Sequence, residues 1–177
     1  TPKKLDPGIV REIIRPDPGV LLTAITTQDP VRVLRDLAPK APAYAQLMRA
    51  RLDLGAKIAS GGWGPVVQAK SLEPGDNGAA VVDLRNRLVA MGYMAPSASQ
   101  SFDAVMSAAV LRFQVDHGLV ADGNARAATI AEINIAPESR MRSVVVAMER
   151  MRWMGDAPLG DRYIWVNQPD FTTKLID

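Results

Sequence analysis

The residues of this chain that could contact a ligand are few, and most of them lie on one short stretch. The 177 residues contain no cysteine and a single histidine. A thiolate nucleophile and a cysteine zinc site are therefore excluded within the chain, and a histidine-centred site is hard to assemble. The helix expected within residues 101–123 commits its apolar stripe to a core, so polar contacts with a ligand would come from its remaining rim and from the preceding helix. The candidates are Arg112, Gln114 and His117 on the rim, and Asn86 on the preceding helix. We expect shallow, weak binding there, with no catalytic residue, no cofactor and no metal.

His117, Gln114 and two aspartates each have a structural interpretation, which is the more common one for their residue types and positions. A histidine in the last turn of a helix, such as His117, is favoured by the helix dipole and the exposed carbonyls. Gln114 follows an aromatic residue expected in the core, where such an amide more often ties down a neighbouring loop. Asp103 and Asp122 fit a helix cap and a turn better than a pair of catalytic carboxylates.

The composition and charge favour a soluble globular chain. Hydrophobic residues make up 47% of it and charged residues 23%, which is enough to build a core. The 21 basic and 19 acidic side chains leave a formal charge of only +2, so no strong attraction to nucleic acid or to a membrane surface is expected. The apolar runs are far shorter than the roughly 18 residues of a membrane span, and the opening "TPKKLDPGIV" has no signal-peptide core.

The first part of the chain, residues 1–64, is predicted to be a helical scaffold segment. Asp17-Pro18 and Asp29-Pro30 each combine an N-cap with proline at the first helical position, so a short helix should follow each pair. A longer helix should then end at "SGGWG". The second and third of these helices carry apolar residues at helical spacing: Val33, Leu34 and Leu37, then Tyr44, Leu47, Met48, Leu54 and Ile58.

A linker over residues 65–80 is predicted to lead into a three-helix module over residues 81–135. The linker segment is rich in proline, glycine and polar residues and has no periodicity. The helical period returns afterwards in two apolar stripes, each followed by a glycine: Val81, Leu84, Leu88, Met91 and Gly92, then Met106, Ala109, Val110, Phe113 and Gly118.

Single residues and short motifs of the sequence predict where the helices of the module begin and end and where the chain turns between them. Asp103 can cap the second helix, and Leu119 is placed to fold back onto its last turn. Asp122-Gly123 predicts a tight turn, and a short third helix should cover about residues 127–133. The unit is small, but it lies within the size range that folds alone.

The module resembles the peptidoglycan-binding module found beside many bacterial wall enzymes. The resemblance covers about residues 74–135 and is carried by "LRNRLVAMGYM", "FDAVMSAAVLRFQVDHGL", "DG" and "TIAEIN". One position departs from the family pattern, because Arg126 stands where the family usually has a glycine four residues after the turn aspartate. If that glycine supplies a positive φ, the turn in this chain must be rebuilt or strained.

Segments on both sides of the module are similar to parts of large L,D-transpeptidases. "YAQLMRARLDLGAKIASGGWGPV" resembles their helical scaffold, and the stretch from "ESRMRS" to the end resembles the join to their catalytic domain. The matching positions of that join are Glu149, Arg150, Arg152, Trp153, Arg162, Tyr163, Val166, Asn167 and Pro169. Three resemblances in the family's order span roughly residues 20–177, and they imply a mainly α chain from a wall cross-linking enzyme.

The same resemblance implies an activity that this chain cannot perform by itself. Enzymes of this family attack a peptidoglycan tetrapeptide stem with a cysteine, form an acyl-enzyme and transfer the stem. Without a cysteine neither step can occur here, so the chain should be inactive alone. The resemblance implies the periplasm or cell envelope as the location. It also implies two partners: the glycan or stem peptide of peptidoglycan, and the remainder of a catalytic domain.

The last part of the chain is predicted to be a connecting helix over residues 136–160 and the first hairpin of a truncated catalytic domain over residues 161–177. Residues 162–167 and 171–176 read as strands that turn through "NQPD". One face of the second strand should carry Phe171, Thr173 and Leu175. An isolated hairpin is marginal in water, so we expect the original polypeptide to continue into a β-rich domain.

Two other classes of function remain open from the sequence. The first is a noncatalytic wall-binding or adaptor protein, whose gene would end near Asp177 and whose hairpin would find a partner chain. The second is a small helical nucleic-acid binder, which the three short helices and basic pI would suit. That class is weakened because the basic side chains of the module lie on separate elements: Arg85, Arg87, Arg112 and Arg126. No nucleic-acid partner is therefore expected.

Overall fold

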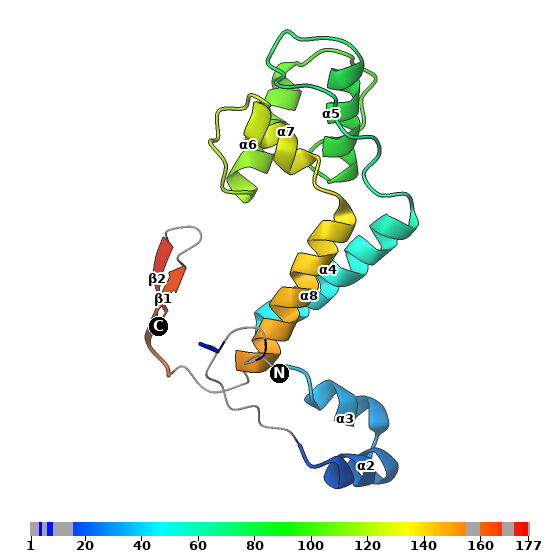
Figure 1. Cartoon of the computed structure of the whole chain (residues 1–177), viewed down its shortest axis with the longest axis vertical. Helices are drawn as coiled ribbons and strands as arrows, with labels where there is room; N and C mark the ends of the chain where they lie inside the picture. Colours follow the sequence, from blue (N-terminus) through cyan, green and yellow to red (C-terminus); the bar gives the residue numbers. More distant parts are fainter. Residues whose placement is uncertain (1–3, 5–6, 9–15, 155–159, 168–171, 177) are drawn as a thin grey trace. The chain divides into compact units, whose positions relative to one another are not determined.

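The computed structural model describes residues 4, 7, 8, 16–154, 160–167 and 172–176. These residues form seven helices and a two-stranded hairpin, so the predicted mainly α fold is confirmed (Figure 1). The helices are α2 Pro18–Thr27, α3 Pro30–Asp36, α4 Pro42–Ala59, α5 Ala79–Ala90, α6 Ala104–Asp116, α7 Ala127–Ile133 and α8 Pro137–Met154. The strands are β1 Tyr163–Asn167 and β2 Thr172–Ile176.

The described chain divides into two compact units. The first contains the described residues of 1–51 and 143–163, and the second those of 52–142 and 164–176. The helices α4 and α8 contribute to both units, whereas α5, α6 and α7 lie wholly in the second. In the described part of the chain, no helix combines the length and the apolar character that a bilayer crossing requires.

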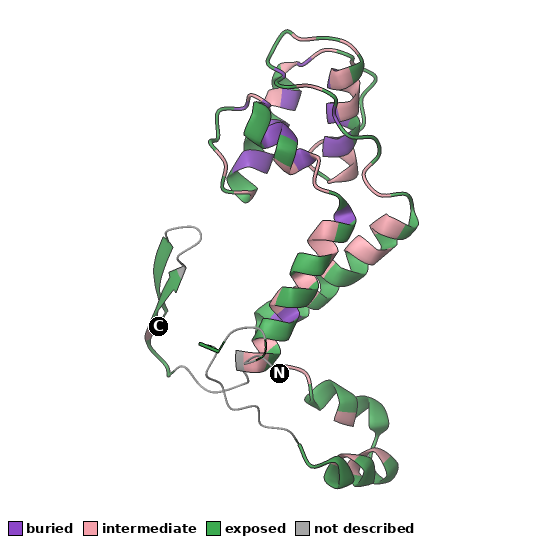
Figure 2. Cartoon of the chain, viewed as in Figure 1, coloured by how far each residue is buried: buried purple, intermediate pink, exposed green. Residues whose placement is uncertain are grey.

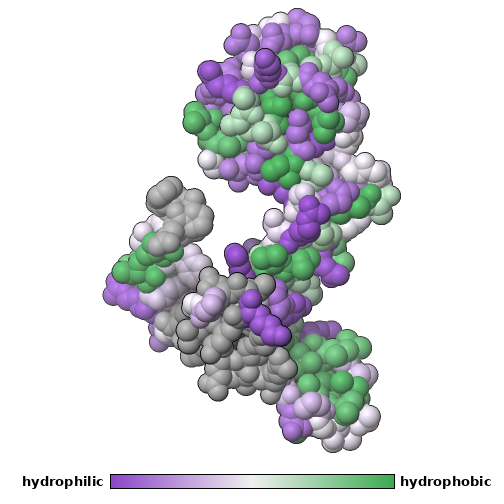
Figure 3. Space-filling model, viewed as in Figure 1, coloured by the Kyte–Doolittle hydropathy of each residue, from purple (hydrophilic) through white to green (hydrophobic). Residues whose placement is uncertain are grey.

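The two short helices of the first unit begin as their sequence predicts. The carboxylate of Asp17 accepts hydrogen bonds from the amides of Gly19 and Val20, at 2.7 and 3.1 Å. The Asp29 carboxylate accepts one from Val31 at 3.0 Å, and proline occupies the first turn of both helices. The apolar side chains of these helices remain largely exposed and form a hydrophobic surface over α2 and α3 (Figure 3).

Within the first unit, α4 and α8 meet through one aromatic residue. Tyr44 on α4 is buried, and the guanidinium of Arg152 on α8 lies 5.4 Å from its ring centroid. That distance is within the range of a cation–π contact. Arg152 also binds the Glu149 carboxylate at 3.3 Å, and Met148 on the same helix is buried. The contact between Tyr44 and Arg152 joins two segments that are about a hundred residues apart in the sequence.

The core of the second unit lies between α5, α6 and α7, where most of the buried residues are found (Figure 2). Both predicted stripes are buried there, except that Met91 is only partly buried. The side chains completely enclosed from α5 and α6 are Val81, Leu84, Leu88, Met106, Ala109, Val110 and Phe113. Asp103 caps α6 by accepting a hydrogen bond from the amide of Met106 at 2.8 Å. The sequence therefore predicted both the helices and the faces that they bury.

The segment predicted to be a linker, residues 65–80, is instead built into this unit. Val67 and Leu72 are buried in the core, and Leu72 forms an antiparallel bridge with Ala125. The backbone of Val67 exchanges two hydrogen bonds with the Asn134 side chain, at 2.9 and 3.0 Å. Isolated bridges and single anchoring residues have no repeating period, which is why the segment resembled a surface crossing.

Two of the basic residues considered for nucleic-acid binding are buried in the fold. Arg85 binds the carbonyl of Ser101 and the carboxylate of Asp103, at 2.7 and 2.8 Å. The Arg87 guanidinium donates to the carbonyls of Ile133, Gly64 and Pro65, and its burial lowers the pKa of this group. Neither side chain is available to a phosphate backbone, which further weakens the nucleic-acid hypothesis.

The tight turn after α6 requires a glycine for two separate reasons. Gly123 has a φ of +73°, and a Cβ atom there would lie 2.6 Å from Ser107 Oγ and 3.2 Å from Ser107 O. Gly118 has a similar φ of +64°, but a Cβ atom there would meet nothing within 4 Å. A side chain at Gly118 would therefore add backbone strain alone, whereas a side chain at Gly123 would add both backbone strain and a steric clash.

We expect Gly123→Ala to destabilise the module clearly more than Gly118→Ala. Backbone strain alone should lower the free energy of unfolding by about 1–2 kcal/mol in each variant. The contact with Ser107 should add at least about 1 kcal/mol in Gly123→Ala only. Urea denaturation followed by circular dichroism measures both losses, and equal losses would show that Ser107 yields without cost.

The hairpin of β1 and β2 presents its side chains to solvent. All five residues of β2 are exposed, and so are the apolar residues of β1 at positions 164–166. The described strands confirm the predicted hairpin, whereas Pro169 and Phe171 lie outside the described residues. A two-stranded ribbon with both faces exposed buries too little area to be stable by itself.

Candidate functional site

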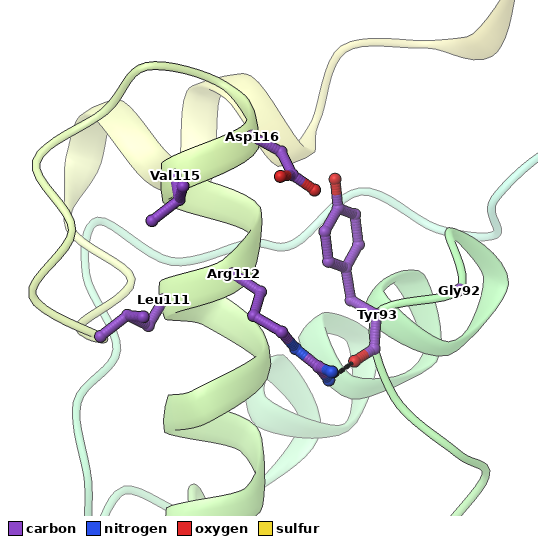
Figure 4. A pocket seen from close by; sticks show the side chains of 6 residues that line it. All are labelled: Gly92, Tyr93, Leu111, Arg112, Val115 and Asp116. Carbon is purple, nitrogen blue, oxygen red and sulfur yellow. Dashed lines mark hydrogen bonds between the residues drawn. The ribbon is translucent and has the colours of Figure 1, made fainter.

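A pocket of about 340 Å³ opens on the surface of the second unit where the end of α5 meets the side of α6 (Figure 4). Two of its residues follow α5, and four lie on one face of α6. The lining residues are Gly92, Tyr93, Leu111, Arg112, Val115 and Asp116.

The pattern of α6 explains why this face is free to form a pocket. The residues committed to the core occupy the opposite side of the helix, so the pairs at positions 111/115 and 112/116 form two adjacent rows on the outer surface. The apolar row is unusually open, with Leu111 41% and Val115 60% exposed. The other row carries Arg112 and Asp116, which are both exposed.

Tyr93 forms the second wall of the pocket because the chain reverses at Gly92. Gly92 has a φ of +86°, and the amide of Tyr93 returns to the carbonyl of Leu88 at 2.8 Å. The half-buried Tyr93 ring then packs edge-on against Phe113, with 5.3 Å between the ring centroids. The core of the module therefore fixes the position of this tyrosine.

Tyr93 contacts both charged residues of the pocket and keeps them apart. The Arg112 guanidinium donates a hydrogen bond to the backbone carbonyl of Tyr93. The Tyr93 hydroxyl points toward the Asp116 carboxylate at the other end of the ring (Figure 4). Although Arg112 and Asp116 are four positions apart on one helix, they form no salt bridge with each other in the described structure. The pocket thus presents a separate cation and anion along an aromatic surface.

The titration of Tyr93 should report this arrangement. Burial, followed by the neighbouring Asp116 carboxylate, raises the pKa of Tyr93 to about 12. A tyrosine whose pKa is raised stabilises the fold below its unfolded pKa of about 10, and this contribution is lost as the pH rises towards 12. We expect Asp116→Asn to lower the pKa of Tyr93, which phenolate absorbance measures against Tyr93→Phe. An unchanged titration would show that Asp116 does not act on the hydroxyl.

Of the four residues predicted to form a binding site, only Arg112 lines this pocket. Asn86 is exposed on α5 but is not part of the lining. His117 packs edge-on against Phe113, with 4.0 Å between ring centroids, and its Nδ1 lies 3.9 Å from Glu132 Oε1. Burial and then Arg140 lower the pKa of His117, which favours its neutral form.

Gln114 corrects the prediction most clearly, because it lies in the core and not on the rim. The side chain is 1% exposed. Its Nε2 donates to Asp122 Oδ1, the Asn124 carbonyl and Thr129 Oγ1, at 3.2, 2.8 and 3.0 Å. Its Oε1 accepts from the amides of Asp122 and Gly123, at 3.1 and 2.9 Å. Every polar atom is therefore used to hold the turn in place, and none is left for a ligand.

The departure from the family pattern at Arg126 introduces no backbone strain. Arg126 has a φ of −73° and a ψ of 175°, which any residue can adopt. Its Nε donates to Asp122 Oδ2 at 2.8 Å. The amide of Asn124 and this guanidinium hold the pKa of Asp122 well below its usual range. The turn is rebuilt around an ion pair at the position where the family has glycine.

A second hollow, of about 520 Å³, runs along α2 in the first unit and is less suited to polar recognition. Thr23 and Thr27 line it, but their hydroxyls donate to the carbonyls of Gly19 and Thr23, at 2.9 and 2.7 Å. Their polar groups are thus largely engaged within the helix. Among the described residues, no group of three histidine, aspartate or glutamate side chains could hold a metal ion.

Sequence reasoning identified Arg112 but missed Tyr93 and Asp116. The sequence feature that could have indicated the pocket is on the outer face of α6. There the exposed apolar pair Leu111 and Val115 lies beside the oppositely charged pair Arg112 and Asp116. Opposite charges at this spacing usually indicate a salt bridge along the helix. The sequence cannot show that a tyrosine from another element separates them.

Comparison with known proteins finds a family match for the segment that contains the pocket. Residues 77–133 match the family model described as "Putative peptidoglycan binding domain". The matched range includes α5, α6, α7 and all the residues that line the pocket. No curated protein matches the chain. Residues 77–133 therefore constitute a peptidoglycan-binding domain by sequence, within a mainly helical chain.

Proposed function

We propose that residues 77–133 attach the chain to peptidoglycan through the pocket between Tyr93 and α6. The family match supports the ligand class, and the pocket supplies both charges and apolar surface within the matched range. The observation that carries the proposal is the separation of Arg112 and Asp116 by Tyr93. Charged groups held apart on an open surface retain hydrogen-bonding capacity that a closed salt bridge would use internally.

The binding should be weak for a single domain. The pocket is open and offers a few polar contacts over a small area. An ordered glycan or peptide loses conformational freedom on binding, which offsets much of the gain from these contacts. We therefore expect a Kd between about 1 mM and 10 μM for an isolated fragment of the wall.

The context that we propose is the recognition and scaffold part of an L,D-transpeptidase in the periplasm or cell envelope. The resemblances in order along the chain support it, as do the exposed apolar strands β1 and β2, which have the character of the start of a larger sheet. In this proposal the domain places a separate catalytic domain on the wall, and the chain itself transfers no stem because it has no cysteine.

The gene sequence after the codon for Asp177 distinguishes this context from a noncatalytic adaptor. The transpeptidase proposal expects a Ser-x-Gly-Cys-type motif there, with a histidine upstream of it. A gene that stops near this codon would instead support a wall-binding adaptor whose hairpin pairs with another chain. Either result leaves the proposal of peptidoglycan binding by residues 77–133 intact.

Cosedimentation with purified sacculi tests the binding proposal. The double variant Arg112→Gln/Asp116→Asn should bind at least about tenfold more weakly, because each substitution removes a charge-assisted contact. Its thermal midpoint should stay near that of the parent chain, since both side chains are exposed. The matched control is Lys70→Gln/Glu73→Gln, which makes the same change of charge at exposed positions outside the pocket.

Three outcomes would count against the proposal. Parent-like binding by the pocket double variant would mean that the site lies elsewhere. Failure of the parent chain to sediment with sacculi would mean that the domain acts as a spacer. Equal loss in the control pair would indicate general charge attraction instead of a pocket.

A further inference from the structure

We propose that the pocket recognises a zwitterionic amino-acid group, namely the free end of a diamino dicarboxylic acid in an uncross-linked stem peptide. This inference rests on the proposed function and specifies which part of peptidoglycan the same site takes. It follows from the arrangement of charge in the pocket and from the chemistry of the polymer.

Both charged groups of the pocket can still bind a ligand. A guanidinium has five N–H donors, and one hydrogen bond from Arg112 is made to the Tyr93 carbonyl. A carboxylate can accept about four hydrogen bonds, and the Tyr93 hydroxyl points toward Asp116 in the pocket (Figure 4). Tyr93 thus lies beside both groups without saturating them.

A ligand with only one kind of charge gains little in such a pocket. An isolated anion would be attracted by Arg112 and repelled by Asp116, and an isolated cation would meet the reverse. A neutral sugar would make hydrogen bonds that are roughly half as strong as charge-assisted ones. A group with an ammonium and a carboxylate on the same carbon is favoured at both ends.

The apolar row of the pocket fits the chain that carries such a group. Leu111 and Val115 also line the pocket, and their side chains extend from α6 beside the charged row, on the side away from the Tyr93 ring (Figure 4). Methylene groups of a long side chain would cover this apolar surface while its charged end reaches Arg112 and Asp116. A diamino dicarboxylic acid in a stem peptide has this form, with methylene groups leading to a free ammonium and carboxylate.

Cross-linking changes that group, so the pocket would also distinguish two states of the wall. When a stem acts as acceptor, its distal ammonium is acylated and loses its positive charge. The product keeps the carboxylate for Arg112 but offers no cation to Asp116. The domain would then favour regions of the wall where acceptor stems are still free.

Titration of the whole ¹⁵N-labelled chain with matched peptides tests this inference by NMR. The probes are a stem tetrapeptide with a free diamino dicarboxylic end, the same peptide acetylated on the distal amine, the same peptide amidated on the distal carboxyl, and a peptide-free N-acetylglucosamine oligomer. The free peptide should bind at least tenfold more tightly than each of the other three. Its chemical-shift changes should centre on the pocket.

Two variants should each lose one part of this discrimination. Asp116→Asn should bind the free and acetylated peptides alike, whereas Arg112→Gln should bind the free and amidated peptides alike. The controls Lys70→Gln and Glu73→Gln should keep the full preference. A loss of folding cannot produce this crossed pattern, because unfolding would weaken the binding of every probe.

The inference is overturned if the free and blocked peptides bind equally, if the sugar oligomer binds most tightly, or if the free peptide does not bind. If the chain still sediments with sacculi in any of those cases, the proposed peptidoglycan binding stands and only its zwitterionic specificity fails. If the chain does not sediment with sacculi, the proposed function fails and the inference fails with it.

Discussion

Phe113→Ala is expected to lower the free energy of unfolding of the module by about 3–5 kcal/mol, the range found for removal of a fully buried aromatic side chain. Phe113 is 0% exposed and lies at the centre of the core between α5, α6 and α7. Its ring contacts those of Tyr93 and His117, with centroid distances of 5.3 and 4.0 Å. The substitution therefore leaves a cavity and removes two aromatic contacts.

Urea denaturation followed by far-UV circular dichroism measures this loss. The matched control is Val105→Ala on the same helix, where the side chain is 65% exposed and its removal should change stability by less than about 0.5 kcal/mol. A loss below about 1 kcal/mol for Phe113→Ala would contradict the packing described for α6.

Gln114→Leu is expected to lower the free energy of unfolding by about 2–4 kcal/mol, although the new side chain is apolar and similar in size. The substitution leaves the amides of Asp122 and Gly123 and the carbonyl of Asn124 without their buried partner. Unpaired buried polar groups are costly, and here they lie in the turn that closes the module onto α7.

The control for this prediction is Gln68→Leu, which makes the same change at an exposed position. It should leave stability within about 0.5 kcal/mol of the parent chain. If Gln114→Leu were as mild as this control, the amide network would not hold the turn. The predicted loss also means that a substitution at Gln114 cannot be used as a silent probe of ligand binding.

The helices and their buried faces could be predicted because these features are local. The signals that start and end these helices act within one or two turns of the helix terminus. They are proline after aspartate at α2 and α3, the Asp103 cap of α6, and the glycines that follow α5 and α6. The apolar stripes of α5 and α6 follow the helical period and need no knowledge of the partner element. The family resemblance of the module rests on the same residues, and the match over residues 77–133 confirms that part of the prediction.

The features that the sequence did not reveal depend on contacts between distant segments. Arg87 reaches the carbonyl of Ile133, and Val67 pairs with Asn134, across 46 and 67 residues. Gln114 lies one position beyond the core stripe and was assigned to the rim, but the turn at residues 122–124 folds over it. The side chains that pair with buried polar groups come from loops, which have no periodic signal.

The candidate site was predicted only in part for the same reason. Arg112 is visible as an outward residue of α6, but its role depends on Tyr93, which reaches the pocket from the end of α5. Local sequence predicts that Arg112 and Asp116 should pair with each other. The interposed tyrosine leaves Arg112 and Asp116 as two separate charged groups in the lining of the pocket.

The most direct test of this account is a residue-by-residue map of the peptidoglycan contact. Soluble fragments released from sacculi, added to the ¹⁵N-labelled chain, should shift the amide signals of Gly92, Tyr93 and residues 111–116 most strongly. Signals from the hollow along α2 and from the exposed surface around Asn86 should move little. A map centred on either of those surfaces, with the pocket signals unmoved, would contradict the claim that this domain binds the wall through Tyr93 and α6.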